Sequence, residues 1–173
     1  MRITATIWTI IGVLTLTTCY GVAQDEPYDL KQLKARIGTW DSEMTVKPAA
    51  WTPEGAHLEC VVVTQPILKG RFIRSTYSAG DYEFLAVATY DAKEKVYRLW
   101  MYDSMGAFPK GDNCGKWNAT SRTIDWRNDQ GDGTVSTSKW HFVDDDHFQW
   151  SAVVKDKDGK VCLDLEGKGT RRK

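Results

Sequence analysis

The stretch from residue 139 to residue 151 decides the fold, and it reads Lys139-Trp140-His141-Phe142-Val143-Asp144-Asp145-Asp146-His147-Phe148-Gln149-Trp150-Ser151. Aromatic and polar residues alternate on both sides of an aspartate-rich turn, which is the pattern of a β-hairpin. A two-residue turn would set Phe142 opposite His147 and mix the two faces. A three-residue turn, residues 144–146, sets Phe142 opposite Phe148 and Trp140 opposite Trp150. This register gives one aromatic face, which we expect to point inward, and one polar face.

The same alternation continues outward from the hairpin along the chain. Ile124 and Trp126 extend the aromatic face on the preceding strand, with Asp125 and Arg127 on the opposite face. Glycine and aspartate turns separate further short runs. The expected strands are residues 39–46, 57–65, 70–78, 82–90, 95–103, 113–119, 122–128, 134–143, 147–155 and 161–171.

One segment has helical periodicity. Leu30, Leu33 and Ile37 fall on one face, Asp29 is a suitable N-cap, and Gly38 is a suitable stop. The pattern therefore predicts a helix over residues 29–37. One helix followed by regularly spaced strands indicates an all-β, antiparallel up-and-down barrel or a sandwich.

Composition narrows the functional classes. The 173 residues carry 23 basic and 23 acidic side chains, and 42% are hydrophobic, with eight tryptophans. Nucleic-acid binders usually carry a strong basic excess, so this balance argues against nucleic acid as a partner. The length is that of one ordinary domain, which we place at residues 24–173.

The first residues have the pattern of a secretory signal peptide, residues 1–23. Arg2 is followed by an uncharged run to Thr18, and Gly21-Val22-Ala23 supplies small residues before a cut at Gln24. The run is too short and too rich in threonine for a typical transmembrane helix. Two alternatives remain, an uncleaved anchor and a lipid anchor on Cys19. The pattern predicts a secreted or periplasmic protein without a membrane span.

Cysteine and histidine give no sign of a metal or redox site. Cys60, Cys114 and Cys162 cannot all pair within one chain, so one disulfide with a free thiol, or three thiols packed as small hydrophobes, are the alternatives. There is no C-x-x-C, H-x-H or H-E-x-x-H spacing. We therefore expect neither a metal site nor a cofactor.

Gly38-Thr39-Trp40 follows the expected helix and opens the first strand. It resembles the G-x-W start of lipocalins and their calycin relatives. The resemblance implies a barrel in which Trp40 plugs the closed end, with Arg171 of the last strand packed across its ring. Gly167 and Gly169 share a face with Arg171, and we expect them to leave space for Trp40.

A more specific resemblance is to the bacterial domain-of-unknown-function family 1579, a group of lipocalin-like domains. It rests on Leu68-Lys69-Gly70-Arg71-Phe72, Tyr90-Asp91 and Trp100-Met101-Tyr102-Asp103-Ser104-Met105-Gly106, together with the aspartate-rich turn and the basic tail. The resemblance covers residues 30–173 and implies a calycin-like barrel. That family has no established activity, so it suggests a fold and no reaction.

The barrel interior is the candidate ligand site, for a small apolar or aromatic molecule. A solid aromatic core without a ligand, as in a structural envelope protein, is the alternative. Arg98 faces inward only if Trp100 and Tyr102 do; if Leu99 and Met101 face inward instead, Arg98 is a surface charge. The candidate ligand-binding residues are Arg98, Trp100, Tyr102, Trp126, Trp140, Phe142 and Trp150.

Asp103 and Ser104 lie at the expected rim of the barrel. They suggest a hydrolase or isomerase with Asp103 as a general base, although no G-x-S-x-G motif surrounds the serine. Aspartate and serine at a strand end more often accept hydrogen bonds from turn amides. Asp103 is therefore a weaker candidate than the ligand-binding set.

Overall fold

The computed structural model describes residues 30–106, 110–111 and 113–173. The expected signal peptide, the Cys19 anchor and the Asp29 cap lie outside these residues. One short helix precedes ten strands. The elements are α1 (Leu30–Lys34), β1 (Gly38–Lys47), β2 (Ala56–Ile67), β3 (Phe72–Ala79), β4 (Tyr82–Asp91), β5 (Val96–Asp103), β6 (Asn113–Asn118), β7 (Thr123–Asp129), β8 (Val135–Phe142), β9 (His147–Lys155) and β10 (Val161–Arg171).

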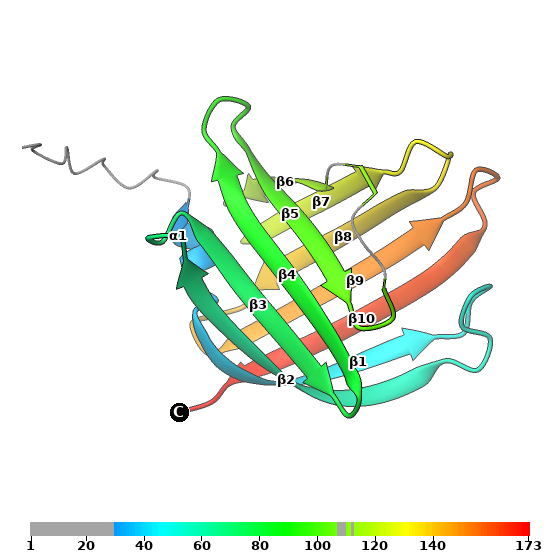
Figure 1. Ribbon diagram of the computed structural model, residues 1–173, viewed down its shortest axis with the longest axis horizontal. Coiled ribbons are helices and arrows are strands. Elements are labelled where there is room, and N and C mark those ends of the chain that lie inside the picture. Colours follow the sequence, from blue (N-terminus) through cyan, green and yellow to red (C-terminus); the bar gives the residue numbers. More distant parts are fainter. Residues whose placement is uncertain (1–29, 107–109, 112) are drawn as a thin grey trace, which may run out of the picture.

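The strands form one closed antiparallel barrel (Figure 1). Each strand pairs with its neighbours in the chain, and β1 closes the sheet by pairing with β10. The predicted up-and-down barrel is confirmed, and the sandwich alternative is excluded. The expected strands match the observed ones to within two residues at each end. Among the described residues, no helix has the length and apolar content needed to cross a membrane.

The register predicted for the β8–β9 hairpin is confirmed. Phe142 pairs with Phe148 and Trp140 pairs with Trp150. The turn is held by Asp144, whose carboxylate accepts the Asp146 amide at 2.8 Å and lies 2.8 Å from His147 Nδ1. The Asp146 amide is the main reason that the pKa of Asp144 lies below its usual value. The aspartate-rich sequence thus fixes the turn length and, through it, which face is aromatic.

The helix is shorter than predicted, and it ends at Lys34 rather than at residue 37. Beyond it, the Arg36 amide bonds to Leu33 O at 3.1 Å and the Ile37 amide bonds to Lys34 O at 3.0 Å. These three-residue turns tighten the chain before β1 begins. Leu30 and Leu33 are both buried, so the predicted apolar face does cover one end of the barrel.

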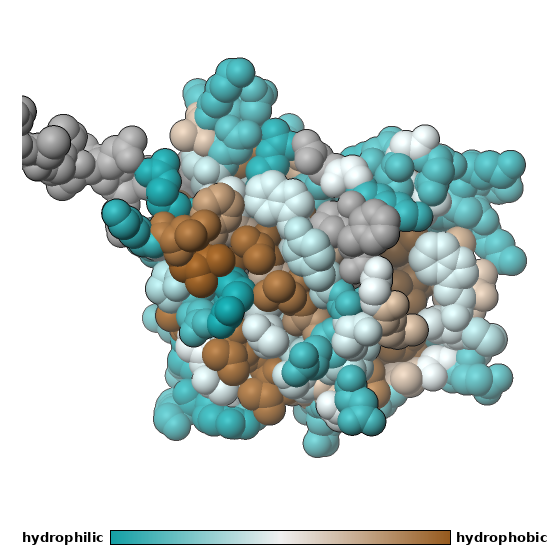
Figure 2. Space-filling view, in the orientation of Figure 1, coloured by the Kyte–Doolittle hydropathy of each residue, from teal (hydrophilic) through white to brown (hydrophobic). Residues whose placement is uncertain are grey.

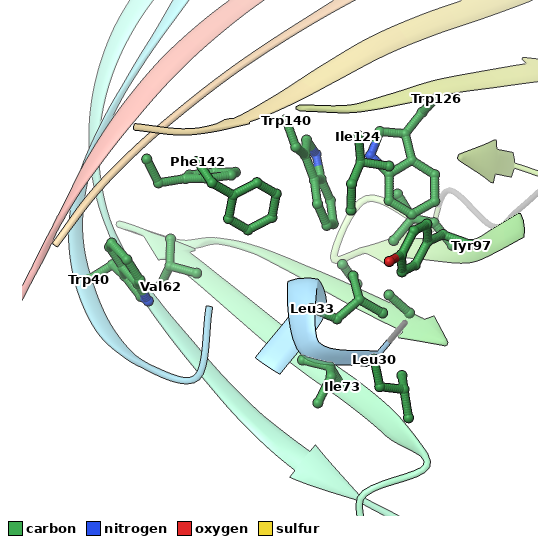
Figure 3. Close-up of a cluster of buried hydrophobic side chains, with 14 residues drawn as sticks. Leu30, Leu33, Trp40, Val62, Ile73, Tyr97, Ile124, Trp126, Trp140 and Phe142 are labelled. Carbon is green, nitrogen blue, oxygen red and sulfur yellow. The ribbon is translucent and has the colours of Figure 1, made fainter. Parts of the chain in front are cut away.

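The core lies at the α1 end of the barrel interior (Figure 3). Inward and outward side chains alternate along each strand, and the inward ones near α1 are the most buried. The buried apolar cluster consists of Leu30, Leu33, Trp40, Val62, Ile73, Ala86, Ala88, Tyr97, Leu99, Ile124, Trp126, Trp140, Phe142 and Phe148.

Candidate functional site

The barrel is closed at the α1 end by Trp40 and Arg171. The Trp40 side chain is 4% exposed, and the guanidinium carbon of Arg171 lies 4.2 Å from its ring centroid. Arg171 also donates to the carbonyls of Ile37 and Ala35, which ties β10 to the segment after α1. A Cβ at Gly38 would lie 2.7 Å from Arg171 Nη1, and Gly38 has φ of +135°. The backbone conformation therefore favours glycine two residues before Trp40, and a side chain there would also displace the Arg171 guanidinium.

The two glycines of β10 do not both serve Trp40, which corrects the sequence expectation. A Cβ at Gly167 would lie 2.4 Å from Trp150 Nε1. A Cβ at Gly169 would lie 2.7 Å from Ser42 Oγ and 3.8 Å from the Trp40 ring. Gly167 therefore leaves space for Trp150, and Gly169 mainly leaves space for Ser42.

Above this closed end lies a packed aromatic layer, which we call the aromatic floor: Trp126, Trp140, Phe142 and Phe148. These side chains are between 2% and 8% exposed. Ring centroids are 4.8 Å apart for Trp126 and Trp140, and 6.1 Å apart for Trp140 and Phe148, in edge-on geometry. Edge-on aromatic contacts at these distances are favourable, so this half of the interior is filled.

The next inward positions are less buried. They form what we call the upper wall: Cys60, Tyr77, Phe84, Met101 and Trp150. Each lies one inward position farther from α1 than a fully buried residue of the same strand. All five pack against the core yet keep accessible surface. The interior is therefore solid near α1 and accessible beyond it. Neither an interior open to a ligand throughout nor a solid aromatic core describes the whole barrel.

The structure places four of the candidate ligand residues inside the barrel. Trp126, Trp140 and Phe142 lie in the aromatic floor, and Trp150 lies in the upper wall. Their neighbours along each strand point outward and are mostly exposed.

Arg98, Trp100 and Tyr102 lie on the outer face, which corrects their expected place in the interior. Leu99 is 3% exposed and points inward, so the residues on either side of it point out. Arg98 forms an ion pair with Asp91 at 3.3 Å and donates to Cys114 Sγ at 3.0 Å. Trp100 pairs with Val87 and Tyr102 with Leu85, both on the outer face of β4, and apolar side chains gather on this face of the molecule (Figure 2).

Asp103 lies inward at the end of β5 and serves a turn. Its Oδ1 accepts the Met105 amide at 3.0 Å, while Ser104 Oγ accepts the Glu83 amide at 3.1 Å. Burial raises the pKa of Tyr82, and the Asp103 carboxylate adds to that effect. The contacts given for Asp103 and Ser104 are thus turn amides and, for Asp103, Tyr82.

Arg36 is the interior residue that the sequence reasoning missed. It is 4% exposed, and its guanidinium carbon lies 4.5 Å from the Trp140 ring and 4.0 Å from the Phe148 ring. Nη2 donates to the Tyr77 hydroxyl at 3.0 Å. Nε and Nη1 have no hydrogen-bond partner among the described residues. One signal was present in the sequence: Arg36 follows Leu33 by three residues and so continues the apolar face of the helix.

Other interior polar groups are only partly satisfied. Thr64 and Ser75 share a hydrogen bond of 2.8 Å between their hydroxyls. Trp126 Nε1 and Asn113 Oδ1 are buried without a partner among the described residues. Unsatisfied buried donors and acceptors are uncommon in folded proteins, and they often mark a place for water or a ligand.

Two surface depressions lie outside the barrel. One, of about 660 Å³, runs over the outer faces of β1 and β8–β10 among charged side chains such as Lys139, Glu166 and Lys168. The other, of about 440 Å³, lies between Leu30, Phe72 and Trp100. In the described part of the chain no group of three acidic, histidine or cysteine side chains could hold a metal ion. Cys60, Cys114 and Cys162 are free thiols.

The fold is shared with solved structures of low sequence identity. An S-type phycobiliprotein lyase from Guillardia theta superposes with a TM-score of 0.59 at 12% identity, over 83% of this chain and 92% of the lyase. Rv2717c from M. tuberculosis gives a TM-score of 0.57 at 13% identity, over 83% of this chain and 97% of that protein.

A third structure is a protein of unknown function from the DUF3598 family of Nostoc punctiforme. It gives a TM-score of 0.57 at 10% identity and covers 81% of this chain. This chain spans 49% of the length of that protein. No family model and no curated protein sequence matches the chain. These likenesses show the barrel fold alone, and the activity is to be argued from the site.

Proposed function

We propose that the barrel binds a small, mainly apolar or aromatic molecule in the half of its interior beyond the aromatic floor. The observation that carries the proposal is the change in burial along the inward face. Leu99 is 3% exposed and Phe148 is 4% exposed, whereas Met101 and Trp150, one inward position farther on, are only partly buried. Apolar surface left accessible inside a barrel is surface that a ligand can cover.

The chemistry of the upper wall favours an apolar or aromatic ligand. Met101, Phe84 and Trp150 offer a thioether and two aromatic rings, and Tyr77 adds a hydroxyl. Methionine adapts to irregular shapes, and aromatic rings bind flat apolar surfaces well. Covering this wall would contribute roughly 25 cal/mol for each Å² of apolar surface removed from water.

The enzyme alternative has less support. Asp103 and Ser104 accept turn amides, which is a structural role for both. A hydrolase would need a nucleophile and a base within hydrogen-bond reach of one another. We therefore propose binding rather than catalysis.

The test is a fluorescence titration with N-phenyl-1-naphthylamine, an apolar dye that brightens in dry sites. Ser138 faces inward beside Ala152, and Thr137 is its exposed neighbour on the outer face. The proposal predicts saturable binding by the wild type, loss of binding in Ser138→Phe, and unchanged binding in Thr137→Phe. Equal binding by all three proteins would mean that the dye binds elsewhere, and no binding at all would favour a filled structural barrel.

The natural ligand is to be sought in the protein as its own host makes it. Small molecules that co-purify are identified by mass spectrometry and then titrated against the stripped protein while tryptophan fluorescence is followed. Because Trp150 belongs to the upper wall, a ligand held there should change the emission.

We also propose that the chain is exported and belongs to the domain-of-unknown-function family 1579. The support is the signal-peptide pattern over residues 1–23 and the motifs of residues 68–72 and 100–106. The mass of the exported protein tests the proposed export and cleavage, and we expect a mature chain that begins at Gln24. A chain that keeps residues 1–23, or that carries lipid on Cys19, would overturn the cleavage site.

A further inference from the structure

We propose that the ligand carries an acidic group, such as a carboxylate, and that Arg36 with Tyr77 holds this group at the aromatic floor. The inference rests on the proposed function and narrows it from apolar molecules in general to apolar acids. Arg36 is a cation inside the barrel, and among the described residues only some of its hydrogen-bond donors have a partner.

Arg36 is a buried charge without a buried counter-charge among the described residues. Its side chain is 4% exposed, and of its nitrogens Nη2 alone donates to the Tyr77 hydroxyl, while Nε and Nη1 have no partner there. Arginine stays charged in proteins. Burying a charge is costly unless it is paired and hydrogen-bonded. Among the described residues this arrangement lacks an acceptor for Nε and Nη1, and an anionic acceptor would both take these hydrogens and balance the charge.

The packing around Arg36 determines where such an acceptor would bind. Its guanidinium carbon lies 4.5 Å from the Trp140 ring and 4.0 Å from the Phe148 ring. Cation–π contacts of this kind stabilise the positive charge through the faces of the guanidinium. The N–H groups lie along its edge, where a carboxylate can accept two parallel hydrogen bonds. The rings therefore hold the cation in place, and the hydrogens of Nε and Nη1 are the ones left for a ligand to accept.

Tyr77 links this cation to the accessible half of the interior. Its ring belongs to the upper wall and packs against Phe84 with ring centroids 5.2 Å apart. Its hydroxyl oxygen accepts from Arg36, so its own proton is free to be donated to a ligand. An acid bound by both groups would place its apolar part against Met101 and Trp150.

The position of Trp126 supports a polar group at this depth. Its indole Nε1 is buried without a partner among the described residues, and its ring lies 4.8 Å from the Trp140 ring that Arg36 covers. Two donors with unused hydrogens thus lie within one aromatic cluster. An acceptor-only ligand group fits such a set better than a hydroxyl, which also brings a donor.

The experiment compares ligands that differ only in the acidic group. Two matched pairs are used: decanoic acid with decan-1-ol, as competitors of bound N-phenyl-1-naphthylamine, and 1-anilinonaphthalene-8-sulfonate with N-phenyl-1-naphthylamine, titrated directly. The wild type should bind the acid of at least one pair about tenfold or more tightly than its neutral partner, which is the scale of a hydrogen bond to a charged group. Equal affinity within both pairs would overturn the inference.

Variants assign the preference to the residues. In Arg36→Met the acid should lose its advantage while the neutral partner still binds, and in Tyr77→Phe the advantage should fall in part. Arg127→Met, an exposed arginine on the outer face of β7, is the matched control and should keep the full preference. If Arg36→Met does not fold, Arg36→Lys is used. Lysine keeps the charge but lacks the planar guanidinium that binds a carboxylate with two hydrogen bonds, so only part of the preference should remain.

The outcomes separate this inference from the proposed function. A protein that binds neutral and acidic ligands equally retains the proposed function and loses the acid site. A preference for acids that survives in Arg36→Met overturns the role of Arg36. A protein that binds neither member of either pair contradicts the proposed function, and the acid site falls with it.

Discussion

The guanidinium carbon of Arg171, near the C-terminus, lies 4.2 Å from the ring centroid of Trp40, at the start of the first strand. The two residues pair directly across the β1–β10 seam that closes the barrel. Trp40 Nε1 donates to Arg36 O at 2.8 Å, and Arg171 donates to Ala35 O at 2.7 Å. The contact between Trp40 and Arg171 thus joins the first and last strands, and the hydrogen bonds of both residues tie these strands to the segment that carries Arg36.

Replacing Trp40 should therefore weaken the whole barrel. Trp40→Ala is expected to lower the free energy of unfolding by ~3–5 kcal/mol, the usual range for a large buried aromatic. Urea unfolding measures it, with Trp51→Ala as the control because Trp51 is 59% exposed. A loss below about 1 kcal/mol for Trp40→Ala would show that the ring is not a plug.

Gly167 is expected to be intolerant of a side chain. Its Cβ would lie 2.4 Å from Trp150 Nε1, so Gly167→Ala must move that ring. We expect a loss of about 1–3 kcal/mol, as for overpacked cores. In Trp150→Leu the clash is gone, so Gly167→Ala should cost much less in that background. Equal costs in both backgrounds, measured in a double-mutant cycle, would show that the two residues do not interact.

The β4–β5 turn should lose stability in acid because of Asp91. Its Oδ1 accepts the Glu94 and Lys93 amides at 3.1 Å each, and Arg98 lies 3.3 Å from Oδ2. The Glu94 amide is the main reason that the pKa of Asp91 lies below its ordinary value of 3.8. Because the folded state holds the carboxylate charged, its contribution is present above that ordinary value and is lost as the pH falls through the lowered pKa.

The comparison with Asp91→Asn isolates this contribution. The variant keeps an acceptor for the turn amides but has no charge to titrate. We expect the wild type to melt at a higher temperature than Asp91→Asn at neutral pH and the difference to shrink as the pH falls below 3.8. A difference that is constant with pH, or NMR titration showing an ordinary pKa for Asp91, would contradict the assignment.

The sequence predicts the strands well because most of them have one apolar and one polar face. The β8–β9 register follows from Trp140, Phe142, Phe148 and Trp150, since a shift by one residue would send all four to the other face. β5 is different: Tyr97, Leu99 and Met101 are apolar or aromatic on one face, and Trp100 and Tyr102 are aromatic on the other. Period-two alternation cannot show which face of such a strand points into the barrel. Only the pairing of β5 with β4 settles it.

Arg36 could not be assigned a role from the sequence alone. The rings that hold it come from β8 and β9, more than one hundred positions along the chain, and Tyr77 comes from β3. Its place on the apolar side of the helix pattern was visible, but the end of α1 at Lys34 sets where its side chain enters the barrel. Where α1 ends depends on how the chain turns from the helix into β1, and the packing of the closed barrel fixes that turn.

Cys60 provides the most direct test of whether the upper wall is a binding site. It faces inward, is only partly buried, and has a pKa that burial raises above its ordinary value. In a variant with Cys19, Cys114 and Cys162 changed to serine, maleimide alkylation at alkaline pH reports on this thiol alone. The account predicts slow but measurable labelling of the folded protein, and strong protection by saturating N-phenyl-1-naphthylamine. An alkylation rate that bound dye leaves unchanged would contradict it.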